Sequence, residues 1–354
     1  MKQNIVFLFR KTTHIPESFK PFVVHFTDSA STSPLLLGPF TKAILRFSQG
    51  IFHSFDMRNS TLMRHVNLYD ASVLMRVFML GNSLCKYGNE GYNISATNIP
   101  HVQNSIVIAH KSIRNNKRLL WKLKRNNNVL LIDIIDGVMK TEKLSSFSKN
   151  LSYSDGIICC SHKSLEYFAK NFPDTPTYFV QHYIDQRIGT ITPSTDYFSP
   201  YYFGAPENLL LFDSIKPLLN IVYTNNKSII NNNCYLRLPE ANFHYAVRQP
   251  VHERGSIRYK PFLKGFTAAF CNANILVHAD DGDALHYLGE DYPYLIKEEL
   301  CEKVVLRYMQ QAKVDFGTGK WRYGLKKMAQ LRKICSEQAM AEQFWNMIQR
   351  IGCS

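Results

Sequence analysis

The sequence lacks the features that would assign it to several common classes of protein. Its longest apolar runs, such as residues 129–135, fall far short of the roughly eighteen residues that a membrane-spanning helix needs. Glycine and proline number only 17 and 15 in 354 residues, which excludes collagen-like and low-complexity chains. The first apolar run is too brief for a signal peptide, and no small-residue cleavage site follows it. We therefore expect a cytoplasmic protein.

The motifs of several site chemistries are also missing. The eight cysteines include no CxxC pair, so we expect reduced, mostly buried thiols and no structural zinc site. The motifs GxSxG, GxxxxGK[ST] and HExxH do not occur, so the usual signals of serine hydrolases, P-loop proteins and zinc proteases are missing. Gly204 lacks the further glycines of a dinucleotide fingerprint, which weakens an oxidoreductase interpretation.

Negative charge is absent from one long stretch and sparse in another. Residues 101–127 carry seven lysines and arginines and no acid, and residues 301–354 carry ten against four acids. These two basic patches contribute thirteen of the fourteen net positive charges. Clustered positive charge attracts nucleic acid, anionic lipid or phosphorylated substrates. Cations interleave with leucines over 114–125 as in a basic amphipathic helix, which favours an anionic membrane surface; solvated helix faces are the alternative.

With 45% hydrophobic residues, the chain is able to form two domains with cores of their own. Apolar runs predict buried strands at 5–9, 22–26, 73–80, 105–109, 129–135, 156–160 and 177–180, and helical patterns lie at 39–52, 117–125 and 164–171. The rhythm breaks over 188–200, which we interpret as a linker, and then restarts, with helical spacing over 303–313 and 321–351.

This alternation predicts an α/β protein with two Rossmann-like domains of parallel strands and C-terminal helices. We expect an N-terminal domain at 1–190, a second domain at 191–335, and a C-terminal helix at 336–354 that returns to the first domain.

The predicted strands of the second half end in residues suited to a phosphate site. Arg248 follows one strand, and Lys260 and Lys264 stand where a helix of small residues begins. Guanidinium and ammonium groups pair with phosphate oxygens, and a helix N-terminus adds favourable potential. Asp281 and Asp283 follow the next strand, where carboxylates are suited to accept hydrogen bonds from sugar hydroxyls. The alternative is a set of surface cations and an acidic turn.

The same region carries a resemblance to a known family. The strings KPFLKGFTAA (260–269) and NILVHADDGDALHYLGEDYPYL (274–295) resemble the donor-binding half of glycosyltransferases with the GT-B fold. The string YFGAPEN (202–208) is similar to the strand and glycine turn that open that domain. VLLIDIIDG (129–137) and DGIICCS (155–161) resemble strands of the acceptor domain. The resemblance covers most of residues 105–296 and implies two Rossmann-like domains that face a central cleft.

The resemblance implies a nucleotide-sugar site in the second domain and a catalytic base in the first. The implied donor-binding residues are Gly204, Asn208, Arg248, Lys260, Lys264, Asp281, Asp283, Glu290, Asp291 and Tyr292. The base that deprotonates the acceptor hydroxyl is sought among polar residues at strand ends, namely His110, Asp133, Asp136, His182 and Asp185, with His25 and Asp28 as a further pair. We favour Asp136 and His110, because Asp136 lies nearer the carboxyl end of its strand than Asp133. We expect no cofactor and no metal.

The sequence thus favours a glycosyltransferase that moves a sugar from a nucleotide-activated donor to a hydroxyl of a glycan or lipid-linked acceptor. Surface polysaccharide or glycoconjugate assembly is the expected context, with peripheral contact to the inner face of the cell membrane as an option. The rival hypothesis is a non-catalytic protein that binds nucleic acid or another polyanion through the two basic patches. The sugar, the nucleotide, the acceptor, the stereochemical course and the oligomeric state stay open.

Overall fold

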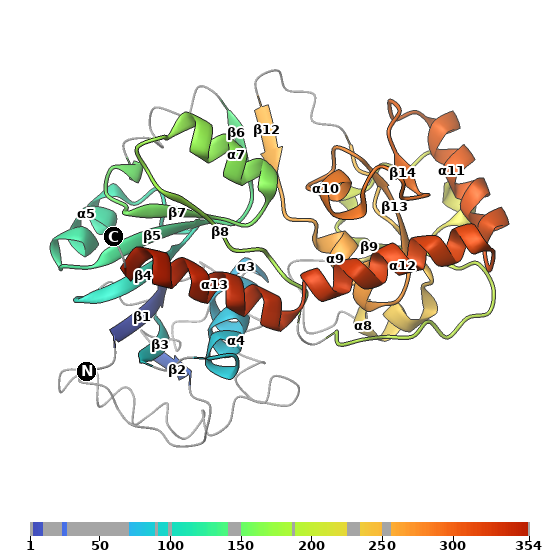
Figure 1. Cartoon of the computed structure of the whole chain (residues 1–354). Helices are drawn as coiled ribbons and strands as arrows, with labels where there is room; N and C mark the ends of the chain where they lie inside the picture. Colours follow the sequence, from blue (N-terminus) through green and yellow to red (C-terminus); the bar gives the residue numbers. More distant parts are fainter. Residues whose placement is uncertain are drawn as a thin grey trace. The chain divides into compact units, whose positions relative to one another are not determined.

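The computed structural model describes residues 3–9, 23–26, 71–88, 91–97, 101–140, 150–185, 188–224, 234–249 and 256–352 (Figure 1). The predicted helix at 39–52, Asp28 and the side chain of His25 lie outside what it describes. The chain divides into two compact units. Unit 1 comprises Met1–Val180 and Met340–Ser354, and unit 2 comprises Gln181–Ala339.

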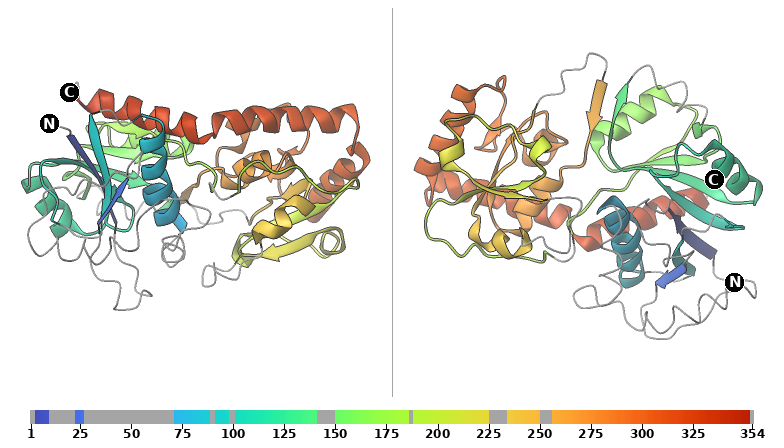
Figure 2. Two further views of the ribbon diagram at one scale, coloured as in Figure 1. Left: turned by 90° about the horizontal axis from the view of Figure 1, so that it is seen from below. Right: turned by 180° about the vertical axis from the view of Figure 1, so that it is seen from behind.

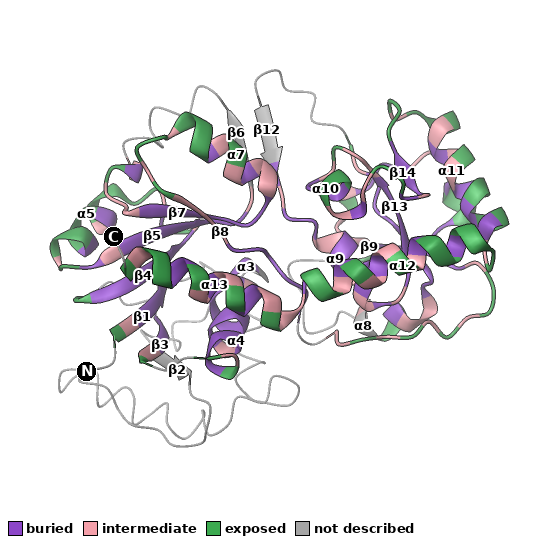
Figure 3. Ribbon diagram, in the orientation of Figure 1, coloured by how far each residue is buried: buried purple, intermediate pink, exposed green. Residues whose placement is uncertain are grey.

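Unit 1 is built on a seven-stranded sheet in the order β2-β3-β1-β4-β5-β7-β8. Its strands are β1 (Gln3–Leu8), β2 (Val23–Phe26), β3 (Tyr92–Thr97), β4 (Ser105–His110), β5 (Val129–Ile134), β7 (Gly156–Cys159) and β8 (Thr177–Phe179), while β6 (Gly137–Lys140) is not part of it. β2 runs antiparallel to β3, and the other described pairs are parallel. Every residue of β4 is buried (Figure 3), which requires cover on both faces of the sheet.

One predicted strand of unit 1 is wrong. Residues 73–80 belong to a continuous helical segment made of α3 (Ala71–Val73), the π-helix η1 (Leu74–Met79) and α4 (Leu80–Lys86). Val77 and Phe78 are at most 1% exposed, so this helix is buried around its circumference. A helix buried on all sides reads as a continuous apolar run, and periodicity alone does not separate it from a buried strand.

The remaining helices of unit 1 begin and end close to the predicted positions. α5 (Lys117–Arg125) is capped by Asn116, whose side chain accepts a hydrogen bond from the Leu119 amide, and α7 (His162–Asn171) begins with a Ser161–Ser164 capping box. α13 (Glu337–Gly352) lies across the sheet (Figures 1 and 2). The Phe344 ring of α13 lies 5.9 Å from that of Phe7 on β1, which ties the end of the chain to the first strand.

Unit 2 is built on a second, five-stranded sheet in the order β10-β9-β11-β13-β14, and its described pairs are parallel. The strands are β9 (Pro200–Gly204), β10 (Asn220–Tyr223), β11 (Phe243–Tyr245), β13 (Asn274–His278) and β14 (Leu295–Ile296), while β12 (Ser256–Tyr259) is not part of this sheet. The helices are α8 (Cys234–Arg237), α9 (Leu263–Phe270), α10 (Ala284–Leu288), α11 (Glu302–Asp315) and α12 (Gly319–Ile334), with short 3₁₀ turns η3 (Pro206–Asn208), η4 (Lys216–Leu218) and η6 (Leu238–Glu240). One core joins the sheet to α9, α10, α11 and α12.

Two segments at the edges of unit 2 differ in detail from the predicted linker and the predicted C-terminal helix. The stretch 188–200 is fastened to unit 2, since the Ile191 amide donates to the Phe270 carbonyl at 2.8 Å and the Ser194 amide to the Pro239 carbonyl at 2.7 Å. The helical spacing predicted over 321–351 corresponds to two helices, α12 and α13, that are separated at Cys335. With two sheets of mainly parallel strands and flanking helices, the chain has the predicted α/β class.

Candidate functional site

The candidate site of unit 2 lies where three neighbouring parallel strands end. β9, β11 and β13 are adjacent in the sheet, so their carboxyl ends meet along one edge. Gly204 ends β9, Arg248 follows β11, and Asp281 follows β13. Ligands of open parallel sheets bind beyond this edge, because the loops there are free to carry polar groups. The sheet therefore brings three of the predicted donor-binding residues together.

Arg248 and Asp281 form an ion pair at this edge. Arg248 Nε lies 3.2 Å from Asp281 Oδ2, and the two side chains are only 13% and 11% exposed. The angles at Nε do not meet those of a hydrogen bond, so the contact is a charge pair with an unsatisfied N–H. Partial burial strengthens the attraction between the two charges, but the contact also offsets the positive charge that Arg248 offers to a ligand.

Lys264 is the most unusual group of the site. Its Nζ is sealed from solvent, has no hydrogen-bond partner among the described residues, and lies 3.7 Å from the centre of the Tyr202 ring. Burial lowers the pKa of Lys264 well below its ordinary value, and the nearby Arg248 cation lowers it further, against the opposing effect of Asp281. A buried ammonium that meets only a ring face still lacks the acceptors for its three N–H groups.

Because Gly204 has no side chain, there is room beside it for the ammonium group of Lys264. A Cβ at this position would lie 2.7 Å from Tyr202 Oη and 3.2 Å from Lys264 Nζ, so any larger residue would displace one or both. Tyr202 is fixed by its own hydrogen bond, which the hydroxyl donates to the Ala205 carbonyl at 2.6 Å. Its burial raises the pKa of Tyr202 to about 12, so the hydroxyl keeps its proton. The glycine at this turn thus allows the backbone, the Tyr202 ring and the Lys264 ammonium to lie close together.

His244 is a member of this cluster that the sequence analysis missed. It lies on β11, is 5% exposed, and has no hydrogen-bond partner for Nε2 among the described residues. Burial, and after it the Lys264 charge, lowers the pKa of His244 to about 3, so the imidazole is neutral near pH 7. In the sequence, His244 is visible only as a polar residue inside an apolar strand, and this pattern alone does not indicate a functional residue.

Lys260 and Asp283 lie on the loops that flank the cluster. The Lys260 carbonyl would lie 2.9 Å from a Cβ on Gly282, so the loop before α9 passes directly over the turn after β13. Gly282 has φ +58, a left-handed conformation that glycine adopts without strain. Asp283 stands at the N-cap position of α10 and is 3% exposed. The loop before α9 thus packs closely against the backbone of the turn at Gly282.

Three of the other four predicted donor-binding residues have their described contacts elsewhere in unit 2. Tyr292 is in the core, where its hydroxyl accepts from the Ile275 amide at 2.8 Å. Asp291 is exposed and pairs with Tyr323 and Lys327 of α12, which lower its pKa to about 2. The third is Glu290, which lies 3.7 Å from Lys297. Asn208, the fourth, ends η3, and its amide donates to the Ala205 carbonyl at 3.0 Å, directly after Gly204.

In unit 1 the two favoured bases have different surroundings. His110 ends β4 and is buried; its Nδ1 accepts from the Ser112 amide at 3.2 Å, which places the proton on Nε2, 3.1 Å from Ser72 Oγ. Both ring nitrogens are therefore engaged. The Asp136 side chain is 37% exposed, and its Oδ1 accepts from Lys111 Nζ at 2.6 Å. Of these two candidate bases, Asp136 is the more accessible.

The alternative Asp133 is held in a buried ion pair. Arg76 of the π-helix donates from Nε to Asp133 Oδ2 at 2.9 Å and from Nη2 to Asp133 Oδ1 at 3.0 Å. Its Nη1 donates to the Val180 carbonyl at 3.1 Å. Both side chains are at most 2% exposed. His182 and Asp185 are buried in unit 2, outside the first domain where a base was sought. Asp133 is therefore committed to Arg76, and the choice of Asp136 as base stays a prediction.

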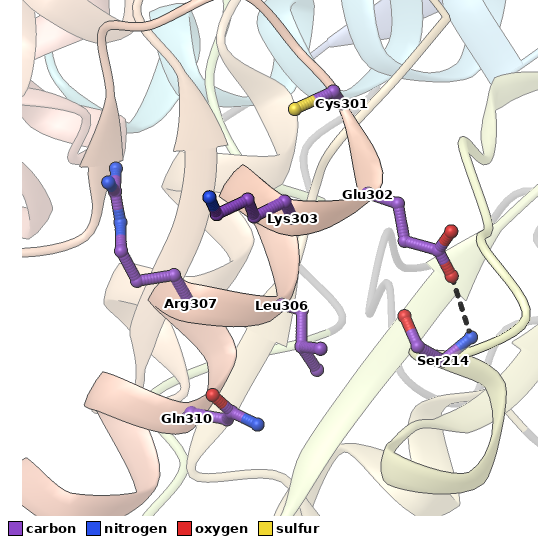
Figure 4. Close-up of a pocket in the computed structure, with 7 residues that line it drawn as sticks. All are labelled: Ser214, Cys301, Glu302, Lys303, Leu306, Arg307 and Gln310. Atoms are coloured by element: carbon purple, nitrogen blue, oxygen red, sulfur yellow. Dashed lines mark hydrogen bonds between the residues drawn. The ribbon is translucent and has the colours of Figure 1, made fainter.

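A surface hollow of about 640 Å³ runs along α11 (Figure 4). Its lining includes Lys303 and Arg307, and Glu302, which accepts a hydrogen bond from the Ser214 amide at 3.1 Å. Arg307 is itself paired with Glu298. None of the predicted donor-binding residues lines this hollow, so we assign it no part in the site.

In the described part of the chain, no group of three or more His, Cys, Asp or Glu is arranged to hold a metal ion. No helix in the same residues combines the length and the apolar character needed to cross a bilayer.

No family model matches the sequence, and no curated protein matches it. HepE from Anabaena, solved in complex with UDP-glucose, is 8% identical with a TM-score of 0.54, and the match covers 99% of this chain and 100% of HepE. The pneumococcal O-GlcNAc transferase GtfA, solved with UDP and GlcNAc, is 9% identical with a TM-score of 0.50 over 70% of this chain and 57% of GtfA. The chain spans only 58% and 55% of the matched chains of the GtfA/B complex and of S. aureus TarM. The match to HepE extends over both units, and it shows that this chain has the GT-B fold.

Proposed function

We propose that this protein is a glycosyltransferase that moves a sugar from a UDP-linked donor to a hydroxyl of a glycan or lipid-linked acceptor, in the assembly of a surface polysaccharide or glycoconjugate. The GT-B fold and the UDP and UDP-glucose of the GtfA and HepE structures favour this class of reaction and this nucleotide. The observation that carries the proposal is the ammonium of Lys264, which is buried at the carboxyl edge of the unit 2 sheet without a hydrogen-bond partner in the described residues.

A diphosphate supplies what Lys264 lacks. Its oxygens accept charge-assisted hydrogen bonds, which are the strongest that an ammonium forms. The second cation, Arg248, stands close enough to Lys264 to lower its pKa, so both are able to reach one ligand of two linked phosphates. Lys260 precedes the same helix and also lowers the Lys264 pKa, which adds a third positive charge at this edge.

These cations define the chemical role of the site. When the bond between the anomeric carbon and the β-phosphate oxygen breaks, negative charge develops on the departing diphosphate. Cations already in place stabilise that charge without further reorganisation, which lowers the barrier to transfer. Asp281, at the same edge, is the carboxylate that we assign to a donor hydroxyl. The proposed chemistry uses side chains alone at the leaving group and requires no metal.

For the acceptor we assign Asp136 the role of base. Its carboxylate is accessible, and a hydroxyl that attacks the sugar must lose its proton to such a group. Lys111 Nζ lies 2.6 Å from this carboxylate and holds it in place. We expect Asp136→Asn to abolish most turnover while UDP affinity stays within about twofold, since a base that acts only in transfer adds nothing to donor binding.

The proposal is tested by UDP binding to the full chain in a titration calorimeter. Lys264→Met keeps the length of the side chain and removes its charge; we expect at least about a tenfold loss of affinity, the equivalent of one charge-assisted hydrogen bond. Lys313→Met, on the exposed side of α11, is the matched control and should leave the affinity unchanged. Equal UDP affinity in wild type and Lys264→Met would remove the phosphate role. Binding of any polyanion alike would favour the rival polyanion-binding hypothesis.

A second arm of the same experiment uses the lowered pKa. A diphosphate placed against Lys264 raises its pKa again, so binding should take up a proton wherever the free lysine is neutral. The affinity for UDP should then fall as the pH rises above the lowered pKa. Titrations in two buffers with different ionisation enthalpies measure the proton uptake, and the uptake should vanish in Lys264→Met.

A further inference from the structure

The outward side of α5 in unit 1 is a cationic surface with an aromatic residue at its centre. The helix packs inward through Leu120 and Leu123, which are buried. At 3.6 residues per turn, the opposite side presents the exposed residues that we call the α5 face, namely Lys117, Arg118, Trp121, Lys122 and Arg125. The helix contains no acid. Its outward side therefore carries four positive charges and one indole.

The positive charges of the α5 face are not neutralised within the described part of unit 1. The nearby acid Asp155 is used by Lys124, at the border of the face, and Asp136 is used by Lys111. Arg118, Lys122 and Arg125 make no ion pair with a described acid. A cluster of like charges that repel one another is costly unless a partner of opposite charge covers it.

Trp121 gives the face its second property. The indole is 45% exposed, although burial of an aromatic ring is normally favourable. The Arg125 guanidinium lies over the ring at 4.8 Å from its centre. One face of the ring is thus occupied, which hinders stacking on a nucleic-acid base, whereas the ring edge stays accessible. Tryptophan beside cations is the combination enriched at the level of lipid headgroups.

We propose that the α5 face docks unit 1 on an anionic phospholipid bilayer, with its cations against the headgroup phosphates and Trp121 at the interface. Each lysine or arginine near such a surface contributes about 1 kcal/mol, so four of them contribute about 4 kcal/mol, or roughly a thousandfold in partitioning. This strength gives reversible, salt-sensitive attachment. It would bring the enzyme to acceptors carried on lipids, but the docking itself does not depend on the proposed transfer reaction.

The test is co-sedimentation of the full chain with phosphatidylcholine vesicles that contain or lack phosphatidylglycerol. We expect binding to the anionic vesicles only, and weaker binding at high salt because the charges are screened. The triple variant Arg118→Gln, Lys122→Gln, Arg125→Gln should lose at least about tenfold in partitioning. The matched control removes the same number of charges from exposed positions of α12, by Arg322→Gln, Lys326→Gln and Lys333→Gln, and should bind as wild type does.

Trp121 allows a second, local measurement. Its fluorescence should shift to the blue on addition of anionic vesicles, and the shift should disappear in Trp121→Phe. Equal losses in the two triple variants would show that only net charge matters and would overturn the proposal. So would an absence of vesicle binding combined with salt-sensitive binding to RNA or DNA. UDP affinity should be unchanged in the α5 triple variant, so failure of the docking proposal is distinguishable from failure of the proposed function.

Discussion

Acid should destabilise unit 2 through the buried imidazole of His244. In the folded protein this ring is 5% exposed, lies 5.3 Å from the Phe203 ring, and offers Nε2 to no described partner. Protonation would place a charge in an apolar environment, close to Lys264. Burial first, and then the Lys264 charge, lowers the pKa of His244 from 6.5 to about 3.

The sign and size of the effect follow from this pKa. The unfolded chain takes up the proton near pH 6.5, whereas the folded chain resists it until about pH 3. Unfolding is therefore coupled to proton uptake between these values, and stability is complete above pH 6.5 and is lost as the pH falls. The loss amounts to about 3 kcal/mol at pH 4 and approaches about 5 kcal/mol below pH 3.

The assay is urea unfolding of unit 2 at a series of pH values, followed by the fluorescence of Trp321, which is buried in its core. Replacing Trp121 and Trp345 by Phe leaves Trp321 as the only tryptophan, so the fluorescence reports on unit 2 alone. His244→Leu removes the titrating group, so its stability should fall by about 3 kcal/mol less than that of the parent between pH 7 and pH 4. His286→Gln removes an exposed imidazole from the same unit and controls for the loss of an imidazole as such. The same pH dependence in His244→Leu and parent would refute the reasoning.

Three further experiments test other contacts. Arg76→Met should destabilise unit 1 by about 3–5 kcal/mol, because it leaves the Asp133 carboxylate buried without its partner, and adding Asp133→Leu should recover most of the loss in urea unfolding. Gly204→Ala should weaken UDP binding at least about tenfold in calorimetry, because the new methyl group occupies the space beside the buried lysine. Asp281→Asn should strengthen the binding of UDP alone by releasing Arg248, and weaker binding would mean that Asp281 positions the guanidinium instead of competing for it.

Most of the fold was accessible from sequence because parallel strands buried on both faces produce recognisable apolar runs. β4, β5 and β7 begin and end close to the predicted residues, and α5 has the predicted bounds. β3 was missed, since Tyr92–Thr97 contains Asn, Ser and Thr and has no continuous apolar run. The helix at 71–86 was misassigned for the opposite reason, that residues 73–80 are apolar except for Arg76 and therefore show no polar face.

The candidate site was predictable where it depends on strand ends and not where it depends on packing. Arg248 and Asp281 could be named because each follows a strand, and parallel strands end at one edge. That the two form an ion pair could not be inferred, because strand register does not fix side-chain direction within a loop. The partner of Asp133 lies 57 positions earlier in the chain, on a helix that was read as a strand. Asp291 was placed in the site by sequence proximity, whereas its described partners lie on α12.

The two cations of the unit 2 edge differ in how much charge they offer in the free protein. Arg248 is always protonated, but Asp281 offsets much of its field. Lys264 has no such partner among the described residues, and burial and the nearby Arg248 cation lower its pKa. The edge therefore attracts an anion strongly only when the ligand carries enough negative charge to compete with the aspartate and to accept hydrogen bonds from the lysine. A diphosphate meets both conditions, whereas a single carboxylate or a neutral sugar meets neither. Under the proposed function, these requirements favour the activated donor over the free sugar.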